Sequence, residues 1–363
     1  MKMLMTAVVL LLCTTTAAAG GIERTNQVMN ILFEEGHYLE VMAIYVNRSI
    51  SGNAVASLGG FDSGDMAPDY MQYSGAYKND ISDHLTLAFV IDQPYGADVA
   101  YPSDTNYFAQ GTTAALDTVA LTAVTRYETS ENWSVYGGLR YQVLEAKASV
   151  PFVAGYTASG DKDGSFGYLV GTAYKIPGFK LRAAITYSSK ISHTVSTTEN
   201  SPLGTGNTSA TNVETPQSVN LDFRTGLATN TLLFAGIRWV NWSDFDITPA
   251  DYQSLTGSSL VSYQHDTTTY TIGLGLRMNE RWSFSGRFIY EPSHGGFTPN
   301  LGPRDGFLGA AIAAQYKMDH TEISIGTSYF DVGDTQTSLG GMQASTFNGN
   351  DAIVTGARVG YRF

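Results

Sequence analysis

The C-terminal stretch 351–363, DAIVTGARVGYRF, alternates between two kinds of side chain. Counting back from the end, one row contains Phe363, Tyr361, Val359, Ala357, Thr355 and Ile353, and the other contains Arg362, Gly360, Arg358, Gly356 and Val354. A period of two residues is typical of a β-strand with one apolar and one polar face. An edge strand with a terminal Phe would favour aggregation in water, so the pattern favours a strand that closes a barrel against an apolar medium.

The first residues, MKMLMTAVVLLLCTTTAAAG, have the layout of a secretory signal. Lys2 precedes an apolar run from Leu4 to Cys13, and Ala17 to Ala19 form a small-residue cleavage pattern. We therefore expect a signal peptide over residues 1–19. Because Cys13 is the only cysteine, the exported chain is expected to contain no disulfide.

The composition points to a Gly- and aromatic-rich chain, with 38 Gly, 22 Tyr and 17 Phe but only 15% charged residues. Beyond the signal, no apolar run approaches the roughly 18 residues of a membrane helix. The net charge of −12 argues against nucleic acid as a partner, because phosphate binding needs clustered Lys and Arg. No cofactor or metal site is expected; GDKDGS at 160–165 lacks most ligands of a calcium loop.

Fourteen alternating segments recur along the chain, most of them near the roughly 9–11 residues that a tilted membrane strand needs. They are 38–46, 70–78, 84–92, 116–127, 133–146, 164–175, 179–189, 214–226, 231–241, 265–278, 281–290, 306–317, 321–331 and 351–363. Short and long connections alternate, and the expected long loops are 47–69, 93–115, 147–163, 190–213, 242–264, 291–305 and 332–350. Such segregation is typical of an outer-membrane barrel with short periplasmic turns.

The two faces of the segments differ in the same sense throughout. Apolar rows such as Leu85/Leu87/Phe89/Ile91 alternate with rows that carry Arg residues, among them Arg126, Arg140, Arg182, Arg224, Arg238, Arg277, Arg287 and Arg358. A charge facing lipid at mid-depth costs about 2–4 kcal/mol, so the Arg rows are expected to face the lumen. A soluble barrel would show the same alternation with its faces reversed; the export signal, the terminal Phe and the loop asymmetry favour the membrane form. The sequence thus predicts an all-β, 14-stranded antiparallel transmembrane barrel over residues 37–363.

A barrel of this size is wide enough to need an occupant or to conduct water. Residues 20–36, GGIERTNQVMNILFEEG, are the candidate plug, with apolar Val28, Met29, Ile31, Leu32 and Phe33; a loose periplasmic tail is the alternative. In the third segment, Pro94, Tyr95 and Gly96 are expected to break or bulge the wall, unless they lie in the loop beyond it.

Several stretches resemble the outer-membrane transporters of long-chain fatty acids and aromatic hydrocarbons, the FadL/TodX family. The shared features are Tyr95-Gly96 after the third strand, Asn132-Trp133-Ser134 at the fifth, Ala146-Lys147, Pro216 at the eighth, and Trp242-Ser243 with Phe245 after the ninth. The resemblance implies passive uptake of a hydrophobic molecule, which is bound inside the barrel. A movement of an N-terminal hatch, here residues 20–36, would then open a lateral path into the bilayer beside the third strand.

The sequence departs from the family in two places. The hatch region is shorter and lacks the family's Asn-Pro-Ala motif, and the positions after Ala146-Lys147 carry no further basic residue. Val150, Phe152 and Val153 are expected to line the apolar entry. Lys147, Arg140, Arg238 and Arg287 are candidates to meet a ligand head group, because buried carboxylates need charged donors; for each Arg, a salt bridge inside the lumen is the alternative.

Other functions remain open at this point. A general diffusion porin, an outer-membrane hydrolase and an adhesion or assembly scaffold are the alternatives. The six His residues, His37, His84, His193, His265, His294 and His320, show no catalytic spacing to a Ser or Asp and are interpreted as isolated polar residues. Expected partners are a hydrophobic small molecule, outer-membrane lipid and, through the strand ending in Tyr361 and Phe363, the barrel assembly machinery.

Overall fold

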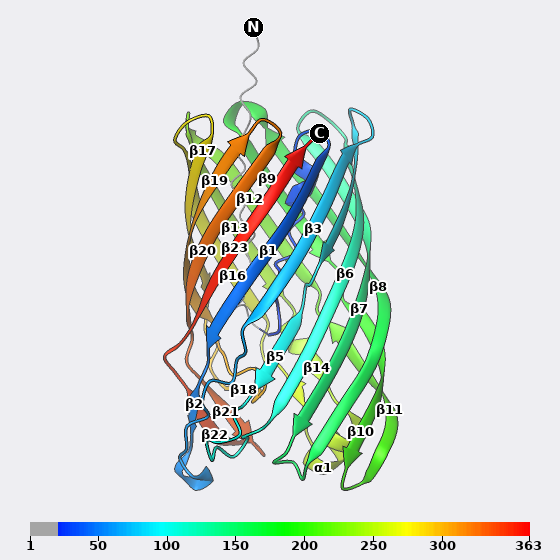
Figure 1. Ribbon diagram of the computed structural model, residues 1–363. Coiled ribbons are helices and arrows are strands. Elements are labelled where there is room, and N and C mark those ends of the chain that lie inside the picture. The colour runs from blue at the N-terminus through cyan, green and yellow to red at the C-terminus, as the bar shows by residue number, and fades with distance from the viewer. Residues whose placement is uncertain (1–20) are drawn as a thin grey trace.

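The computed structural model describes residues 21–363, which form a closed β-barrel with a segment inside its lumen (Figure 1). The predicted signal peptide, residues 1–19, and Gly20 lie outside the described residues. The first and last wall strands pair in an antiparallel ladder from Tyr38↔Arg362 to Ser49↔Asp351, and this ladder closes the barrel.

Fourteen antiparallel strand positions build the wall of the described chain. In order around the barrel they are β1 (Tyr38–Ser49), β3 (Tyr70–Asp80), β4 (Leu85–Asp92) continued by β5 (Gly96–Ala100), β6 (Thr113–Glu128), β7 (Trp133–Val150), β8 (Tyr156–Ile176), β9 (Leu181–Ser188) continued by β10 (Ile191–Ser201), β11 (Gly204–Thr215) continued by β12 (Ser218–Ala228), β13 (Thr231–Val240), β16 (Thr267–Arg277), β17 (Trp282–Glu291), β19 (Phe307–Met318), β20 (Thr321–Val332) and β23 (Asn350–Arg362). Each of the fourteen predicted segments coincides with one position, so the predicted strand count is confirmed.

The short strands outside the wall and α1 gather at the rim opposite the C-terminus (Figure 1). A small sheet contains β2 (Gly52–Ala54), β18 (Phe297–Thr298), β21 (Thr335–Leu339) and β22 (Met342–Phe347), while β14 (Asp246–Ile247) and β15 (Val261–Ser262) flank α1 (Ala250–Thr256). Single 3-10 turns are η1 (Asn30–Phe33), η2 (Ala56–Leu58), η3 (Pro177–Phe179) and η4 (Trp242–Asp244). Residues 21–363 contain no helix long and apolar enough to cross a membrane. The short turns lie at the C-terminal rim, which is therefore the periplasmic one.

Two expected loops are instead largely strand. The segment 190–213 forms most of the β10–β11 hairpin, and much of 147–163 extends β7 and β8. In β10 the buried row is Ile191, His193 and Val195, whereas the exposed row is Ser192 and Thr194. The hairpin lacks an apolar outer row because its outward side does not face hydrocarbon, so a search for lipid-facing alternation missed it.

The predicted facing of the two rows is confirmed along the wall. Outward residues such as Leu139, Phe288 and Ile312 are 65–67% exposed, whereas Arg358 is 3% exposed. On β23 the row of Phe363, Tyr361, Val359 and Ile353 is exposed, as expected for a face solvated by lipid tails. Contact of this strand with the barrel assembly machinery stays a prediction.

The plug segment, residues 21–36, runs through the lumen. It contacts β13 through Glu23–Arg238, β7 through Gln27–Arg140, β9 through Asn30–Arg182 and β23 through Glu34–Arg362. Strands on opposite sides of a closed barrel can be reached together only from inside. Met29, Ile31 and Leu32 are buried and pack against lumen residues on the periplasmic side. The segment that precedes β1 therefore fills part of the barrel interior.

The third wall strand is interrupted at residues 93–95. β4 pairs with both neighbours, β3 and β6, but among the described residues β5 pairs only with β6. The first residues of β3, Tyr70 to Ser74, therefore lack a strand partner on this side. We call this separation of β3 and β5 the wall gap. Pro94 has no N–H to donate, so the break falls where a ladder bond is already impossible.

Candidate functional site

An apolar cavity, the outer chamber, lies in the extracellular half of the lumen and holds about 70 Å³ of free space. Side chains from β5, β6, β7, β8, β10 and β11 form its walls, and residues between β13 and β16 cover it. Lining residues include Ile22, Ala97, Val99, Leu116, Leu144, Ala146, Ala158, Val195, Val213, Phe245, Ile247, Leu260, Val261, Tyr263 and Leu301. This chemistry suits an apolar ligand, because cavities for small molecules are mostly apolar with few polar groups.

The cover of the chamber is the segment between β13 and β16, residues 241–266, which contains α1. The Glu199 carboxylate on β10 accepts hydrogen bonds from the backbone N–H of Asp251, at 3.0 Å, and of Tyr252, at 3.2 Å. The Tyr156 hydroxyl donates to the same carboxylate at 2.8 Å. These contacts attach the start of α1 to the β10–β11 hairpin. Burial raises the pKa of Tyr263 to about 12, so its hydroxyl stays neutral at the chamber wall.

A second cavity, the gap cavity, adjoins the outer chamber on the side of the wall gap. The two share five lining residues, which are Ile22, Ala97, Val99, Tyr263 and Leu301. Tyr70 of β3 and Gly96 of β5, the strands that separate at the gap, also line it, as does Arg48. The outer chamber therefore communicates with the one place where the third strand leaves its neighbour.

Side chains span the wall gap in place of ladder bonds. The Arg48 guanidinium donates to the Pro68 carbonyl at 2.8 Å and to the Asp98 carbonyl at 3.1 Å. The Gln93 amide oxygen accepts the Tyr73 N–H at 3.0 Å. These are single polar contacts between separated strands, and they can break without disturbing a continuous ladder.

The plug segment closes the gap from inside. The Arg24 N–H donates to the Pro94 carbonyl at 2.9 Å, and the Gly96 N–H donates to the Ile22 carbonyl at 2.8 Å. The Arg24 guanidinium continues into the gap, where it pairs with Asp98 at 2.5 Å and with Asp117 at 3.2 Å. It also lies 4.5 Å from the ring centre of Tyr70. A Cβ on Gly96 would collide with this guanidinium, so the Gly leaves the space that Arg24 occupies.

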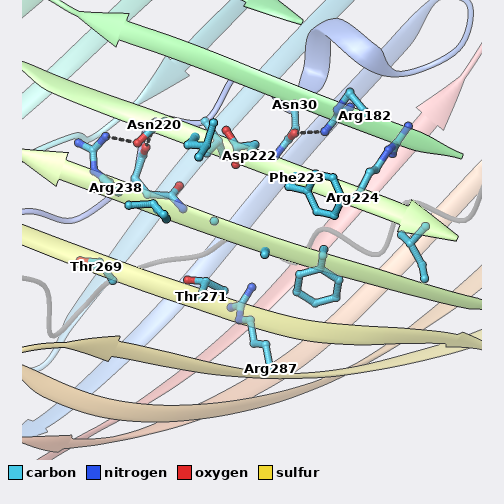
Figure 2. A pocket seen from close by; sticks show the side chains of 18 residues that line it. Asn30, Arg182, Asn220, Asp222, Phe223, Arg224, Arg238, Thr269, Thr271 and Arg287 are labelled. Atoms are coloured by element: carbon cyan, nitrogen blue, oxygen red, sulfur yellow. Dashed lines mark hydrogen bonds between the residues drawn. The ribbon is translucent and has the colours of Figure 1, made fainter. Parts of the chain in front are cut away.

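A third cavity, the inner cavity, lies between the plug segment, at Asn26 to Asn30, and the wall strands β12 and β13, and also holds about 70 Å³ (Figure 2). Its lining differs from that of the outer chamber: Arg182, Arg224, Arg238 and Arg287 contribute to it together with Asp222. Figure 2 shows Arg238 bonded to Asn220 and Arg182 bonded to Asn30. No residue lines both the inner cavity and the outer chamber.

The structure separates the predicted entry and head-group residues into different places. Val150, Phe152 and Val153 pack beside α1, at the outer end of the chamber and not in its lining. Lys147 lies at the chamber wall and is exposed. Arg287 lines the inner cavity.

Two of the predicted head-group candidates contact the plug segment. Arg238 Nε donates to the Glu23 carboxylate at 2.8 Å, and Arg140 donates to Gln27. Arg238 therefore forms the salt bridge inside the lumen that was the alternative to a head-group role. A head-group role for either residue stays a prediction.

The predicted plug and gate residues fall into two groups. Pro94, Tyr95 and Gly96 lie at the strand interruption, with the Tyr95 hydroxyl accepting from Gln27 at 3.1 Å. Met29, Ile31 and Leu32 are buried, and Phe33 lies under the Arg182 guanidinium at 4.1 Å. Val28 lines the inner cavity.

The interpretation of all six His residues as isolated polar groups is wrong for His193. Its imidazole is buried, with Nδ1 2.9 Å from Asp163 and Nε2 3.2 Å from Gln142. Sequence spacing did not reveal the pair, because His193 lies on β10 and Asp163 lies on the adjacent strand β8, 30 residues away in the chain. Neither contact is with a Ser, Thr or Cys side chain. The described residues contain no group of three or more potential metal ligands.

Sequence reasoning also missed the residues that build the chamber and close the gap. Ile22, Glu23, Arg24, Phe245 and Tyr263 come from segments far apart in the chain. The adjacent charges Glu23-Arg24 in an otherwise uncharged start of the exported chain were the available signal, because buried ions require partners.

Comparisons with known proteins agree with this geometry. A family model described as "Outer membrane protein transport protein (OMPP1/FadL/TodX)" matches residues 25–363. The fold is similar to that of a Pseudomonas aeruginosa FadL homologue, with a TM-score of 0.74, 16% identity and 92% of each chain covered. It is also similar to the P. putida toluene transporter TodX, with a TM-score of 0.64, 12% identity and 91% of each chain covered.

A third similar structure is the Ralstonia pickettii toluene transporter TbuX, with a TM-score of 0.64 and 14% identity over 91% of this chain and 90% of that one. No curated protein matched the sequence. The family model spans nearly the whole described chain, and the fold agrees with it. The chain therefore belongs to the OMPP1/FadL/TodX family of outer-membrane transport proteins.

Proposed function

We propose that this protein takes up hydrophobic small molecules through the outer membrane by passive diffusion, with long-chain fatty acids, related lipids and aromatic hydrocarbons as the candidate cargo. The observation that carries the proposal is the apolar outer chamber next to an unpaired stretch of wall. An apolar molecule gains about 0.8 kcal/mol for each buried methylene. A dry chamber in the lumen therefore attracts such cargo, whereas an aqueous pore would repel it.

The proposed exit is lateral. Cargo moves from the outer chamber to the gap cavity past Ala97 and Val99, and leaves between β3 and β5 into the bilayer. In the present arrangement Arg24 fills that opening. Because the backbone of the plug segment pairs with Pro94 and Gly96, a shift of the plug withdraws Arg24 and frees the gap in one movement. We expect the polar contacts of Arg48 and Gln93, and those of the Gln72 amide with the Gln93 and Arg24 carbonyls, to break as well.

The proposed entry lies among the extracellular segments. Val150, Phe152 and Val153 form an apolar surface beside α1, where cargo would first bind before the cover moves. Lys147 at the chamber wall is the cation nearest to a cargo head group in this scheme. Arg140 and Arg238 act on the cargo indirectly, since they hold the plug segment.

The occupied lumen favours this function over a general diffusion porin. The plug segment fills the lumen between the outer chamber and the inner cavity with buried residues. The two cavities share no lining residue. A Ser–His type hydrolase is disfavoured because the buried His193 contacts Asp163 and Gln142, and neither contact provides the hydroxyl or thiol that such an imidazole activates.

The test is uptake by cells that lack their own transporters for such compounds. Ala97 lines both the outer chamber and the gap cavity, so Ala97→Trp fills the passage between them. We expect uptake of radiolabelled oleate or toluene to fall at least tenfold in this variant. The matched control is Ala123→Trp, because Ala123 pairs with outward-facing Leu139 on the lipid side.

Both variants should reach the outer membrane in equal amount, as heat-modifiable mobility in gels reports. Normal uptake of both compounds by the Ala97→Trp variant would exclude the proposed passage. Mass spectrometry of molecules that co-purify with the detergent-extracted protein would identify the cargo.

A further inference from the structure

The inner cavity has a charge arrangement that the uptake route does not use. Arg182 on β9 and Arg224 on β12 are direct cross-strand partners in the ladder (Figure 2). Like charges directly opposite each other destabilise a sheet. A strand pair that keeps two guanidinium groups in this register needs a compensating negative charge.

The protein's own carboxylates compensate this charge only in part. Asp222 is the carboxylate that lines the inner cavity. The Glu23 carboxylate accepts two hydrogen bonds from Arg238, and that of Glu34 pairs with Arg362 at 3.1 Å. Even with Arg238 paired to Glu23, three further Arg residues line the cavity beside one lining carboxylate, Asp222, so the cavity carries a net positive charge.

The guanidinium groups also retain hydrogen-bonding capacity. Nε of Arg182 and both Nε and Nη1 of Arg224 are buried atoms without a hydrogen-bond partner in the described part of the chain. Arg182 is only 6% exposed, although its Nη2 donates to Asn30. A buried donor that stays unsatisfied costs roughly 1–3 kcal/mol, and more when it is charged. Two such groups on one cavity wall are therefore expected to have a ligand.

The cavity has the size and shape for such a ligand. Its free space of about 70 Å³ corresponds to roughly two water molecules at about 30 Å³ each, which is room for a small oxyanion group. Arg forks bind carboxylate and phosphate groups through paired N–H donors. The Phe234 and Leu232 side chains line the same cavity and supply an apolar side.

We infer that the inner cavity is an oxyanion-binding site, in which Arg182 and Arg224 hold a carboxylate or phosphate group between the plug segment and the wall. The site is separate from the outer chamber, and it does not depend on the proposed uptake route. Its ligand is either a free phosphate or the head group of an amphipathic carboxylate; both present the same oxygens to the two guanidinium groups.

Calorimetric titration of the full-length protein in a non-ionic detergent tests this inference. The probes are inorganic phosphate and hexanoate, each in a low-salt buffer. We expect saturable binding of at least one probe with one site per chain. Arg224→Gln should weaken binding at least tenfold, whereas Arg224→Lys, which keeps the positive charge, should weaken it less.

The matched control is Arg277→Gln, because Arg277 lies at a periplasmic turn, bonds Asn230 and does not line the cavity. Stronger binding of phosphate would identify a phosphate ligand. Affinity that rises along the series from acetate to hexanoate would identify an amphipathic carboxylate. The inference fails if the wild-type protein shows no saturable binding of either probe, or if Arg277→Gln weakens binding as much as Arg224→Gln does. Uptake of toluene should be unchanged in Arg224→Gln, which separates this site from the uptake route.

Discussion

Guanidinium groups make several of the contacts between the plug segment and the wall. Arg140 and Arg182 reach the plug from the wall, whereas Arg24 reaches the wall from the plug. The inward row of Arg residues was predictable, because a charge cannot face lipid at mid-depth without a cost. The partners of these Arg residues were not predictable. Glu23 and Arg238 are 215 positions apart, and strand alternation indicates which face a side chain is on but not which residue it contacts.

Replacing Arg24 with Met should loosen the wall gap. The Met side chain keeps part of the apolar stem but loses the hydrogen bonds to Asp98 and Asp117. A hydrogen bond to a charged group contributes about 1.5–3 kcal/mol, and the pair with the exposed Asp117 contributes less. A loss of about 2 kcal/mol raises the open population on the order of thirtyfold.

In planar-bilayer recordings, a larger open population of the Arg24→Met variant appears as more frequent brief channel openings. Arg281→Met serves as the control, because Arg281 lies at a periplasmic turn, far from the wall gap, where its guanidinium donates to the Tyr316 hydroxyl at 3.4 Å. Equal, low conductance of wild-type and Arg24→Met proteins would show that Arg24 does not close the gap.

At the scale of elements, membrane-facing alternation predicted all fourteen wall positions but not the β10–β11 hairpin. The outer row of the hairpin is mostly polar, with Ser192 and Thr194 on β10 and Asn212 and Glu214 on β11, so it carries no lipid-facing signal. The same hairpin attaches α1, a helix of 7 residues that no periodicity could reveal. The break in the third strand was predictable, because Pro94 and Gly96 both weaken a ladder.

We expect Glu199→Gln to release the start of α1. The Gln side chain keeps an acceptor oxygen but loses the negative charge that strengthens the hydrogen bonds from the N–H groups of Asp251 and Tyr252. Charge-assisted bonds are about twice as strong as neutral ones, so a loss of about 1 kcal/mol corresponds to roughly fivefold faster amide exchange. Hydrogen–deuterium exchange followed by mass spectrometry measures this rate in peptides that contain α1.

The control is Glu214→Gln, which removes a carboxylate that bonds Lys190 and Ser192 on the exposed face of the hairpin. Its α1 peptides should exchange as in the wild-type protein. Unchanged exchange in Glu199→Gln would mean that packing of Tyr252 and Leu255, and not the carboxylate, holds the cover.

On the scale of the whole molecule, closure of the barrel was predictable and the position of its cavities was not. Strand count and loop asymmetry follow from local patterns, and the terminal strand signalled a partner across the chain, now seen as β1. The outer chamber requires Ile22, Leu144, Val213 and Tyr263 to converge from four separate segments. Convergence of this kind depends on barrel register, which alternation leaves undetermined.

A disulfide between the plug segment and the wall tests whether plug movement is needed for uptake. Glu23 and Tyr95 form an antiparallel bridge, so Cys residues at these positions lie within the usual Cα range of about 4.4–6.8 Å. Cys13, in the predicted signal, is the only native cysteine that could compete. We expect the oxidised double variant to bind cargo but to transport it at least tenfold more slowly than its reduced form.

The reduced form is its own control, because both forms lack the same native contacts. Equal transport by the two forms would show that cargo passes with residue 23 fixed against residue 95. A single Glu23→Cys variant, treated with the same oxidant, excludes effects of oxidation elsewhere.

The pairing of β1 with β23 imposes an order of events on biogenesis. The seam between these strands requires β23 (Asn350–Arg362), so the cylinder stays an open sheet until that strand pairs with β1. Residues 21–36 precede β1 and end up enclosed by that seam, bonded to β7, β9 and β13. We therefore expect the plug segment to be placed before the two edge strands pair. A chain whose edge strands pair first would form a closed barrel without its plug.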